Sequence, residues 1–141
     1  MHPIKKWHEL VKSGESDQLD DLLDDNIIFF SPVVFTPQKG KKIAKIYLIA
    51  AGRVLGESNA LRYVKEIIGE NSAVLEFESE VDGIHINGID LISWNQNGKI
   101  TEFKVMVRPL QAVNKLHQEM QRMMMKDHSA LSWLKKIFKK G

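Results

Sequence analysis

The stretch IHINGIDLISWNQNGKITEFKVMVR, residues 84–108, decides the fold because it predicts two long strands folded back on each other. The turn is expected at Asn97-Gly98, since a two-residue hairpin turn needs positive φ at both central positions, and these residue types tolerate it best. Asp90 lies in the middle of the first strand, between two apolar residues. An ionised carboxylate among apolar neighbours is costly, so Asp90 must be exposed, paired or protonated.

The composition describes one domain of ordinary makeup. The chain has 141 residues, of which 43% are hydrophobic and 27% are charged, and this length is sufficient for a buried core. It has no cysteine, which excludes disulfides, thiolate catalysis and cysteine-based zinc sites and fits a reducing compartment. The first residues lack an apolar run of signal-peptide length, and no segment approaches the roughly 18 apolar residues of a membrane span. We therefore expect a cytoplasmic protein.

The net charge of +2 is unevenly distributed along the chain. Residues 126–141 hold five lysines and one aspartate, so the positive charge lies in this tail and the preceding body is mildly acidic. The pI near 8.8 is therefore no argument for nucleic-acid binding, and no nucleic-acid partner is expected. Leu131, Leu134 and Ile137 predict a short basic amphipathic helix. Its candidate roles are weak contact with an anionic membrane surface or a partner, or packing on its own domain or a dimer mate.

Apolar periodicity and turn residues predict the elements. Helical spacing marks residues 2–12, a short segment after the N-cap candidate Ser16, and residues 41–55, whose apolar positions follow one face. A short strand is expected over 27–30, and a closing helix after Pro109. Four longer strands are expected at about 60–68, 72–81, 84–95 and 99–108. Helices segregated from a meander of antiparallel strands make an α+β domain with its helices on one face of the sheet.

The two tight turns determine which residues share a face of the sheet. Across the turn at 97–98, Asp90 opposes Val105, and across the turn at 82–83 it opposes Leu75. The face that holds Asp90 is otherwise almost entirely apolar, so we expect the helices to cover it. Its members are Leu75, Phe77, Ser79, Ile86, Asp90, Ile92, Phe103, Val105 and Val107.

The opposite face of the sheet is polar, with an apolar middle formed by Ile89, Leu91 and Met106. Such a mixed patch suits a homodimer contact; the other interpretation is a solvated face with scattered apolar residues. A bulge at Gly88 would change the assignment of faces. The register of the first long strand is ambiguous, so Tyr63 stays unassigned.

A resemblance to a known family rests on three segments: WHELVKSGESDQLDDLLDDNI (residues 7–27), FFSPVVFTPQKG (29–40) and NGIDLISWNQNGKITEFKVMVRP (87–109). They resemble the nuclear transport factor 2-like superfamily, which includes SnoaL-type polyketide cyclases and ketosteroid isomerase. The resemblance implies a cone-like, cystatin-like fold: a curved antiparallel sheet wrapped on helices, with a pocket on its concave face. It implies a SnoaL-like domain over residues 1–125, and the basic tail over 126–141 lies beyond the resemblance.

The functional residues of ketosteroid isomerase transfer to this sequence only in part. The resemblance places its oxyanion-hole aspartic acid on Asp90, its oxyanion-hole tyrosine on Trp7 and its catalytic base on Ser31. Serine cannot replace a carboxylate base at neutral pH without another base beside it, and Trp7 offers only an indole N–H. Ketosteroid isomerase is the known example of an apolar site that keeps a carboxylic acid protonated, and the resemblance implies this pocket chemistry for Asp90.

The candidate site combines these residues with their apolar neighbours. Asp90 is the candidate catalytic residue, and the candidate ligand-binding residues are Trp7, Ser31, Tyr47, Phe77, Ile92, Phe103 and Val105. The other interpretations are core packing for the aromatic and apolar residues, a plain turn residue for Ser31, and a structural, hydrogen-bonded acid for Asp90. No metal site is expected, since His8 lacks the second histidine of a helical zinc motif. Phosphate-loop and nucleophile motifs are absent from the sequence, so no cofactor is expected.

Two functions follow as hypotheses. The first is a homodimeric pocket protein that binds a small, largely apolar molecule bearing a carbonyl or hydroxyl group, with proton transfer of the isomerase, cyclase or hydratase kind as the candidate reaction. The second is a non-catalytic binding or dimeric interaction module, in which side chains fill the pocket and the dimer face or the basic tail carries the function.

Overall fold

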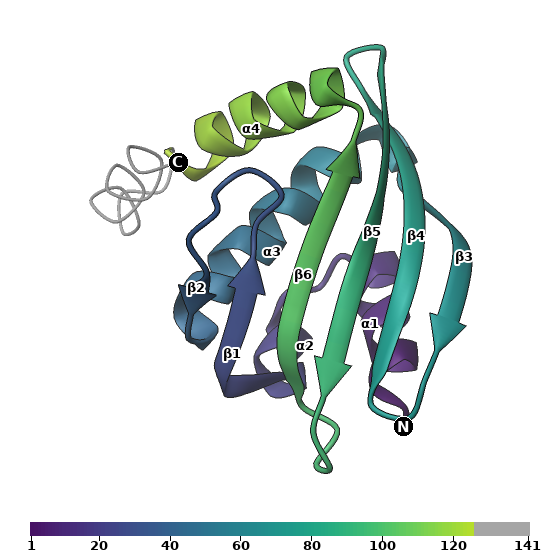
Figure 1. The fold of residues 1–141 in the computed structure, drawn as a ribbon, viewed down its shortest axis with the longest axis vertical. Coiled ribbons are helices and arrows are strands. Elements are labelled where there is room, and N and C mark those ends of the chain that lie inside the picture. Colours follow the sequence, from purple (N-terminus) through teal and green to yellow (C-terminus); the bar gives the residue numbers. More distant parts are fainter. Residues whose placement is uncertain (126–141) are drawn as a thin grey trace.

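A computed structural model describes residues 1–125, so the predicted tail helix lies outside the described residues. The chain forms one sheet with its helices packed mainly on one side (Figure 1). In chain order the elements are α1 (Pro3–Ser13), α2 (Asp17–Leu22), β1 (Leu23–Phe30), β2 (Gln38–Lys39), α3 (Lys41–Leu55), the short 3-10 helix η1 (Glu57–Asn59), β3 (Arg62–Ile68), β4 (Ser72–Val81), β5 (Ile84–Trp94), β6 (Ile100–Arg108) and α4 (Leu110–Met124).

The six-stranded sheet has the order β2-β1-β6-β5-β4-β3 and is not closed into a barrel. The meander β3 to β6 is antiparallel, as predicted from its turns. The sheet as a whole is mixed, because β1 lies parallel to β6, a pairing that the expected antiparallel sheet did not include. No turn connects β1 directly to β6, so turn residues carry no information about their relative direction. β1 is also longer than the predicted strand over 27–30, because it begins directly after α2 at Leu23.

The turn between β4 and β5 is the two-residue turn that the sequence predicts. Asp82 and Gly83 have φ angles of 51° and 79°, and Val81 pairs with Ile84 on either side. The turn between β5 and β6 differs from the prediction, because of its two expected residues only Gly98 has a positive φ, of 73°.

The β5–β6 loop spans one residue more than a two-residue turn. The Gly98 amide donates to the Asn95 carbonyl, and the Asn95 side chain accepts hydrogen bonds from the Asn97 and Lys99 amides. A register shift between Ser93 and Trp94 compensates for this extra residue. The predicted pairing beyond that point is therefore confirmed, including Asp90 opposite Val105.

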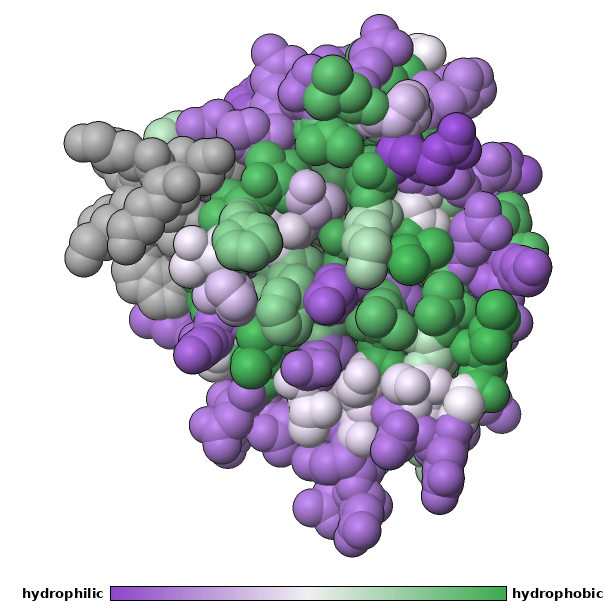
Figure 2. All heavy atoms as spheres, in the orientation of Figure 1, coloured by the Kyte–Doolittle hydropathy of each residue, from purple (hydrophilic) through white to green (hydrophobic). Residues whose placement is uncertain are grey.

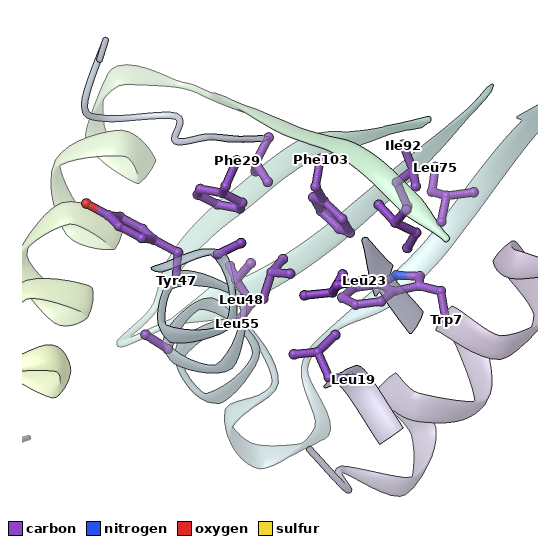
Figure 3. Close-up of a cluster of buried hydrophobic side chains, with 14 of the residues drawn as sticks. Trp7, Leu19, Leu23, Phe29, Tyr47, Leu48, Leu55, Leu75, Ile92 and Phe103 are labelled. Atoms are coloured by element: carbon purple, nitrogen blue, oxygen red, sulfur yellow. The ribbon is translucent and has the colours of Figure 1, made fainter. Parts of the chain in front are cut away.

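Most residues that the strand register places on the inner face of the sheet are also buried. Leu75, Phe77, Ile92 and Phe103 are completely or almost completely buried. The helices α1, α2 and α3 lie behind this face in Figure 1, and α4 crosses one end of the sheet. Figure 3 shows how side chains from α1, α3 and the strands meet in this layer. The predicted helix over 41–55 is confirmed as α3, which begins after Gly40, where φ is 106°, and ends before Gly56.

Gly88 continues the β5 ladder without the bulge that the sequence left open, since it pairs with both Phe77 and Val107. A Cβ atom at this position would meet the Met106 carbonyl oxygen and the Phe77 ring, each at 2.6 Å. The missing side chain thus lets the Phe77 ring lie over the strand, two residues from Asp90.

The outer face of the sheet carries an exposed apolar patch of four residues, Ile67, Ile89, Leu91 and Met106. Figure 2 shows hydrophobic surface across the middle of this face. Ile67 exposes 61% of its surface and Met106 exposes 46%, while Ile89 and Leu91 are half-buried. Within residues 1–125, no helix is long and apolar enough to cross a membrane.

Candidate functional site

Asp90 is held on the inner face of the sheet by the pairing of three strands. It lies between Leu75 on β4 and Val105 on β6, and both neighbours are buried. Only 5% of its own surface is exposed. The side chain is therefore removed from bulk water by strand alternation, which sends its neighbours Ile89 and Leu91 to the opposite face.

A chain of two hydrogen bonds ends on this carboxyl group. The Tyr63 hydroxyl donates to Asp90 Oδ2 over 2.6 Å, and the Trp7 indole N–H donates to the Tyr63 oxygen over 3.0 Å. Because indole nitrogen can only donate, Trp7 fixes the direction of the chain and turns the Tyr63 proton toward Asp90. Asp90 Oδ1 makes no hydrogen bond with any residue of 1–125.

Burial is the main cause of the raised pKa values of Asp90 and Tyr63. Loss of hydration raises the pKa of Asp90 from its ordinary 3.8 to about 7, against the opposing effect of the Tyr63 hydrogen bond. Burial and the nearby Asp90 carboxylate together raise the pKa of Tyr63 well above 10. Tyr63 therefore keeps its proton, while Asp90 populates both its acid and its carboxylate form near neutral pH.

Asp90 lines a cavity of about 630 Å³ between the sheet and the helices. The wall is mostly apolar and contains residues from α1, α3, α4 and the strands. Its lining residues are Trp7, His8, Leu10, Val11, Lys12, Gly14, Ser16, Leu19, Phe29, Pro32, Leu48, Ile49, Ala51, Gly52, Arg53, Leu55, Gly56, Asn59, Leu61, Tyr63, Phe77, Asp90, Phe103, Val105, Leu116 and Met120. Within residues 1–125, Asp90 is the one carboxylic acid in this wall.

The structure brings five of the eight candidate residues together at this cavity. They are Trp7, Phe77, Asp90, Phe103 and Val105. The rings of Trp7 and Phe103 meet edge to face with their centroids 4.9 Å apart. These contacts form a continuous aromatic and aliphatic surface beside the carboxyl group.

The other three candidates lie outside the cavity wall. Ile92 is fully buried in the sheet layer. Tyr47 points from α3 toward α4, and its hydroxyl is buried without a hydrogen-bond partner among the described residues (Figure 3). The Ser31 hydroxyl accepts hydrogen bonds from the Val33 and Val34 amides and so closes the bend in which it lies. The neighbouring Pro32 lines the cavity in its place.

Tyr63 is the functional candidate that sequence reasoning missed. Counting back from the Gly69–Asn71 turn, regular alternation would place Tyr63 opposite Glu78 on the outer face. A register shift between Tyr63 and Lys65 instead pairs it with Phe77 and turns its ring inward. The signal available in the sequence was one aromatic residue in an otherwise aliphatic and charged strand, and that signal does not reveal a bulge.

A polar pair borders the same tyrosine. The His8 ring lies edge to face with the Tyr63 ring at 5.1 Å between centroids and is hydrogen-bonded to the Glu66 carboxylate. His8 is half-exposed and lines the cavity, so this pair lies between the Tyr63 ring and solvent-accessible surface. No group of three or more histidine, aspartate and glutamate side chains within residues 1–125 is placed to hold a metal ion.

No family model and no curated protein matches the chain, whereas solved structures do. A steroid delta-isomerase from Pseudomonas aeruginosa matches with a TM-score of 0.83 and 28% identity over 88% of this chain and 90% of that one. An uncharacterized protein with a cystatin-like fold from Silicibacter pomeroyi matches with a TM-score of 0.85 and 28% identity, covering 97% and 95% of the two chains. The epoxide hydrolase/cyclase-like enzyme SalBIII, with a role in pyran ring formation in salinomycin, matches with a TM-score of 0.61 and 14% identity over 75% and 88%.

Several further matched structures are NTF2-like proteins of unknown function. The α+β architecture with its sheet wrapped on helices is therefore the cystatin-like, NTF2-like fold. The neighbours are consistent with the nuclear transport factor 2-like superfamily, which the resemblance of the three segments implied.

The raised pKa of Asp90 makes the stability of the folded protein depend on pH. The folded state holds the Asp90 proton more tightly than the unfolded chain, so the wild-type protein loses stability as pH rises from about 4 to about 7. Asp90→Asn stays neutral throughout, and we expect it to match the wild type near pH 4 and to exceed it above pH 7 by up to about 4 kcal/mol. Chemical denaturation at several pH values measures the difference. A difference that does not change with pH would contradict a raised pKa.

Proposed function

We propose that the chain binds a small, largely apolar molecule through a carbonyl or hydroxyl oxygen placed at Asp90. The single observation that carries the proposal is the buried carboxyl group at a cavity wall, with Oδ2 engaged by Tyr63 and Oδ1 unengaged. The cavity volume of about 630 Å³ lies within the range of small-molecule sites. Its apolar walls would bury the body of the ligand, and Oδ1 would fix the orientation of the ligand.

The hydrogen-bond chain supports Oδ1 as the oxygen that meets the ligand. Since the Tyr63 hydroxyl donates to Oδ2, the acidic proton of a neutral Asp90 is best placed on Oδ1. In that form Asp90 donates a hydrogen bond to a ligand carbonyl; in the ionised form Oδ1 accepts one from a ligand hydroxyl. A pKa of about 7 makes both forms available near neutral pH, which suits a general acid or base.

One carboxyl group can serve both halves of a proton-transfer reaction. Oδ1 gives its proton to the ligand oxygen as the bonding at the adjacent carbon changes, and the resulting carboxylate takes up the proton that the ligand releases. Isomerisation and ring closure fit this balance, and hydration fits it when an added water molecule supplies the hydroxyl group and releases the proton. The steroid delta-isomerase relative supports the proposal. Ser31 has no part in this proposal, because it lies outside the cavity wall and its hydroxyl oxygen accepts hydrogen bonds from two backbone amides.

The tyrosine of this pair comes from an unexpected element. The resemblance to ketosteroid isomerase places the oxyanion-hole tyrosine at position 7, where this chain has tryptophan. Trp7 instead supports Tyr63, and Tyr63 supplies the phenol beside Asp90 from strand β3. The tyrosine and aspartate of ketosteroid isomerase thus have a counterpart in Tyr63 and Asp90. Here the Tyr63 hydroxyl donates to Asp90 and positions the acid.

Naphthyl methyl ketone is a suitable probe because its carbonyl accepts a hydrogen bond and its methyl protons exchange through the enol. We expect its affinity to fall as pH rises above about 7, where Asp90 loses the proton it donates. In heavy water, the wild type should exchange the methyl protons on the order of 100-fold faster than Asp90→Asn. Quenching of tryptophan fluorescence measures binding, and proton NMR measures exchange.

The matched control is Glu76→Gln, which removes a carboxylate from β4 on the outer face of the sheet. It should retain both the pH-dependent binding and the exchange. An affinity for naphthyl methyl ketone that changes neither with pH nor on Asp90→Asn would contradict the proposal. Binding that depends on Asp90 but leads to no exchange would select the non-catalytic binding module.

A second function, self-association through the outer apolar patch, is favoured by the exposure of that patch. We propose that a second copy of this chain covers Ile67, Ile89, Leu91 and Met106. Lys104 and Glu76 lie on the same face and carry opposite charges. In a two-fold symmetric dimer, Lys104 of each copy can therefore face Glu76 of the other. Contact of this kind removes apolar surface from water without a foreign partner.

Met106→Glu places a charge in the outer apolar patch, and we expect it to shift the protein from dimer to monomer in analytical ultracentrifugation. The matched control is Leu110→Glu, which changes an exposed apolar residue at the start of α4 and should leave the dimer intact. A wild-type protein that remains monomeric at high concentration would contradict the proposal.

A further inference from the structure

Two cationic side chains lie at the solvent-exposed mouth of the cavity, whereas an acid lies at its buried end. Lys12 and Arg53 both line the cavity and are both exposed to solvent. Lys12 lies in the last turn of α1 and Arg53 in the last turn of α3, so two helices contribute one cation each. Asp90 lies at the buried end and is 5% exposed. The cavity is thus polar at both ends and largely apolar along its walls.

Neither cation is neutralised by the described part of the chain. Lys41, Lys45 and Lys115 each form an ion pair with an aspartate, at 3.1, 3.1 and 2.7 Å respectively. The side chains of Lys12 and Arg53 make no ion pair or hydrogen bond with another residue of 1–125. Their charges are therefore available to a ligand.

The helix dipole explains only part of this arrangement. A cation in the last turn of a helix interacts favourably with the backbone carbonyls there, which accounts for the residue type at each position. It does not account for the position of both residues at the same cavity. Asp90, the one acid among the lining residues of 1–125, is buried and forms no ion pair with either cation. Solvent-exposed charges of one sign at an opening attract ions of the other sign.

We propose that the ligand is an amphiphile with an anionic group, which Lys12 and Arg53 hold at the mouth while its oxygen-bearing apolar body fills the cavity toward Asp90. This inference rests on the proposed function and adds the class of the substrate. A neutral apolar molecule would use the walls and Asp90 but would leave both cations without a partner. An anionic amphiphile satisfies both ends, and the two cations set the end from which it enters.

The test compares hydroxydecanoic acid, with its hydroxyl at the chain end, and its methyl ester, which is neutral. At low salt we expect the acid to bind the wild-type protein about three- to tenfold more tightly than the ester. Lys12→Gln combined with Arg53→Gln should abolish this preference. Lys5→Gln and Lys42→Gln, which remove exposed lysines from the same two helices outside the cavity wall, should keep it. Isothermal titration calorimetry measures each affinity.

Salt provides a readout that needs no variant, since the preference for the acid should shrink as ionic strength rises. Equal affinities for acid and ester in the wild type would overturn the inference. If Asp90→Asn still weakens binding of the acid and of the ester, the proposed function stands without an anionic group on the ligand. Failure of the acid, the ester and naphthyl methyl ketone to bind would overturn both. A preference that survives in the double variant would also overturn the assignment to Lys12 and Arg53.

Discussion

A carboxyl group cannot be buried among apolar side chains as a free charge, and the structure around Asp90 follows from this constraint. Tyr63 gives the group one hydrogen bond, and Trp7 gives Tyr63 another. This network is too small to compensate for a fully desolvated charge, so the pKa rises and the neutral acid becomes accessible near neutral pH. A buried acid that changes its protonation state near neutral pH and borders a cavity is a candidate functional site.

The register of the sheet places the acid on its inner face. A shift of one residue in β5 would send Asp90 to the outer face and bring Ile89 and Leu91 under the helices. Two irregularities protect the inner layer from such a shift. One lies between Ser93 and Trp94 and absorbs the extra loop residue, and the other lies before Lys65 and turns Tyr63 inward. The hydrogen-bond network thus depends on strand irregularities as much as on residue type.

Sequence reasoning identified the acid, its face and its immediate neighbours because tight turns at both ends of β5 constrain pairing locally. It missed Tyr63 because a bulge reverses alternation without a residue signature, and it missed the parallel β1–β6 pair because no turn connects those strands. Ser31 and Tyr47 were placed by positional analogy and by an apolar stripe. Neither a position in a family pattern nor an apolar stripe determines where a side chain points. Ser31 Oγ accepts a hydrogen bond within its own bend, and Tyr47 points toward α4.

The most direct test of this account is the titration of the Asp90 carboxyl carbon by NMR in carbon-13-labelled protein, assigned with Asp90→Asn. The account predicts a midpoint near pH 7 in the wild type and a higher one in Tyr63→Phe, because that change removes the hydrogen bond that lowers the pKa. A wild-type midpoint near the ordinary value of about 4 would show a hydrated carboxylate, and the site described here would not exist.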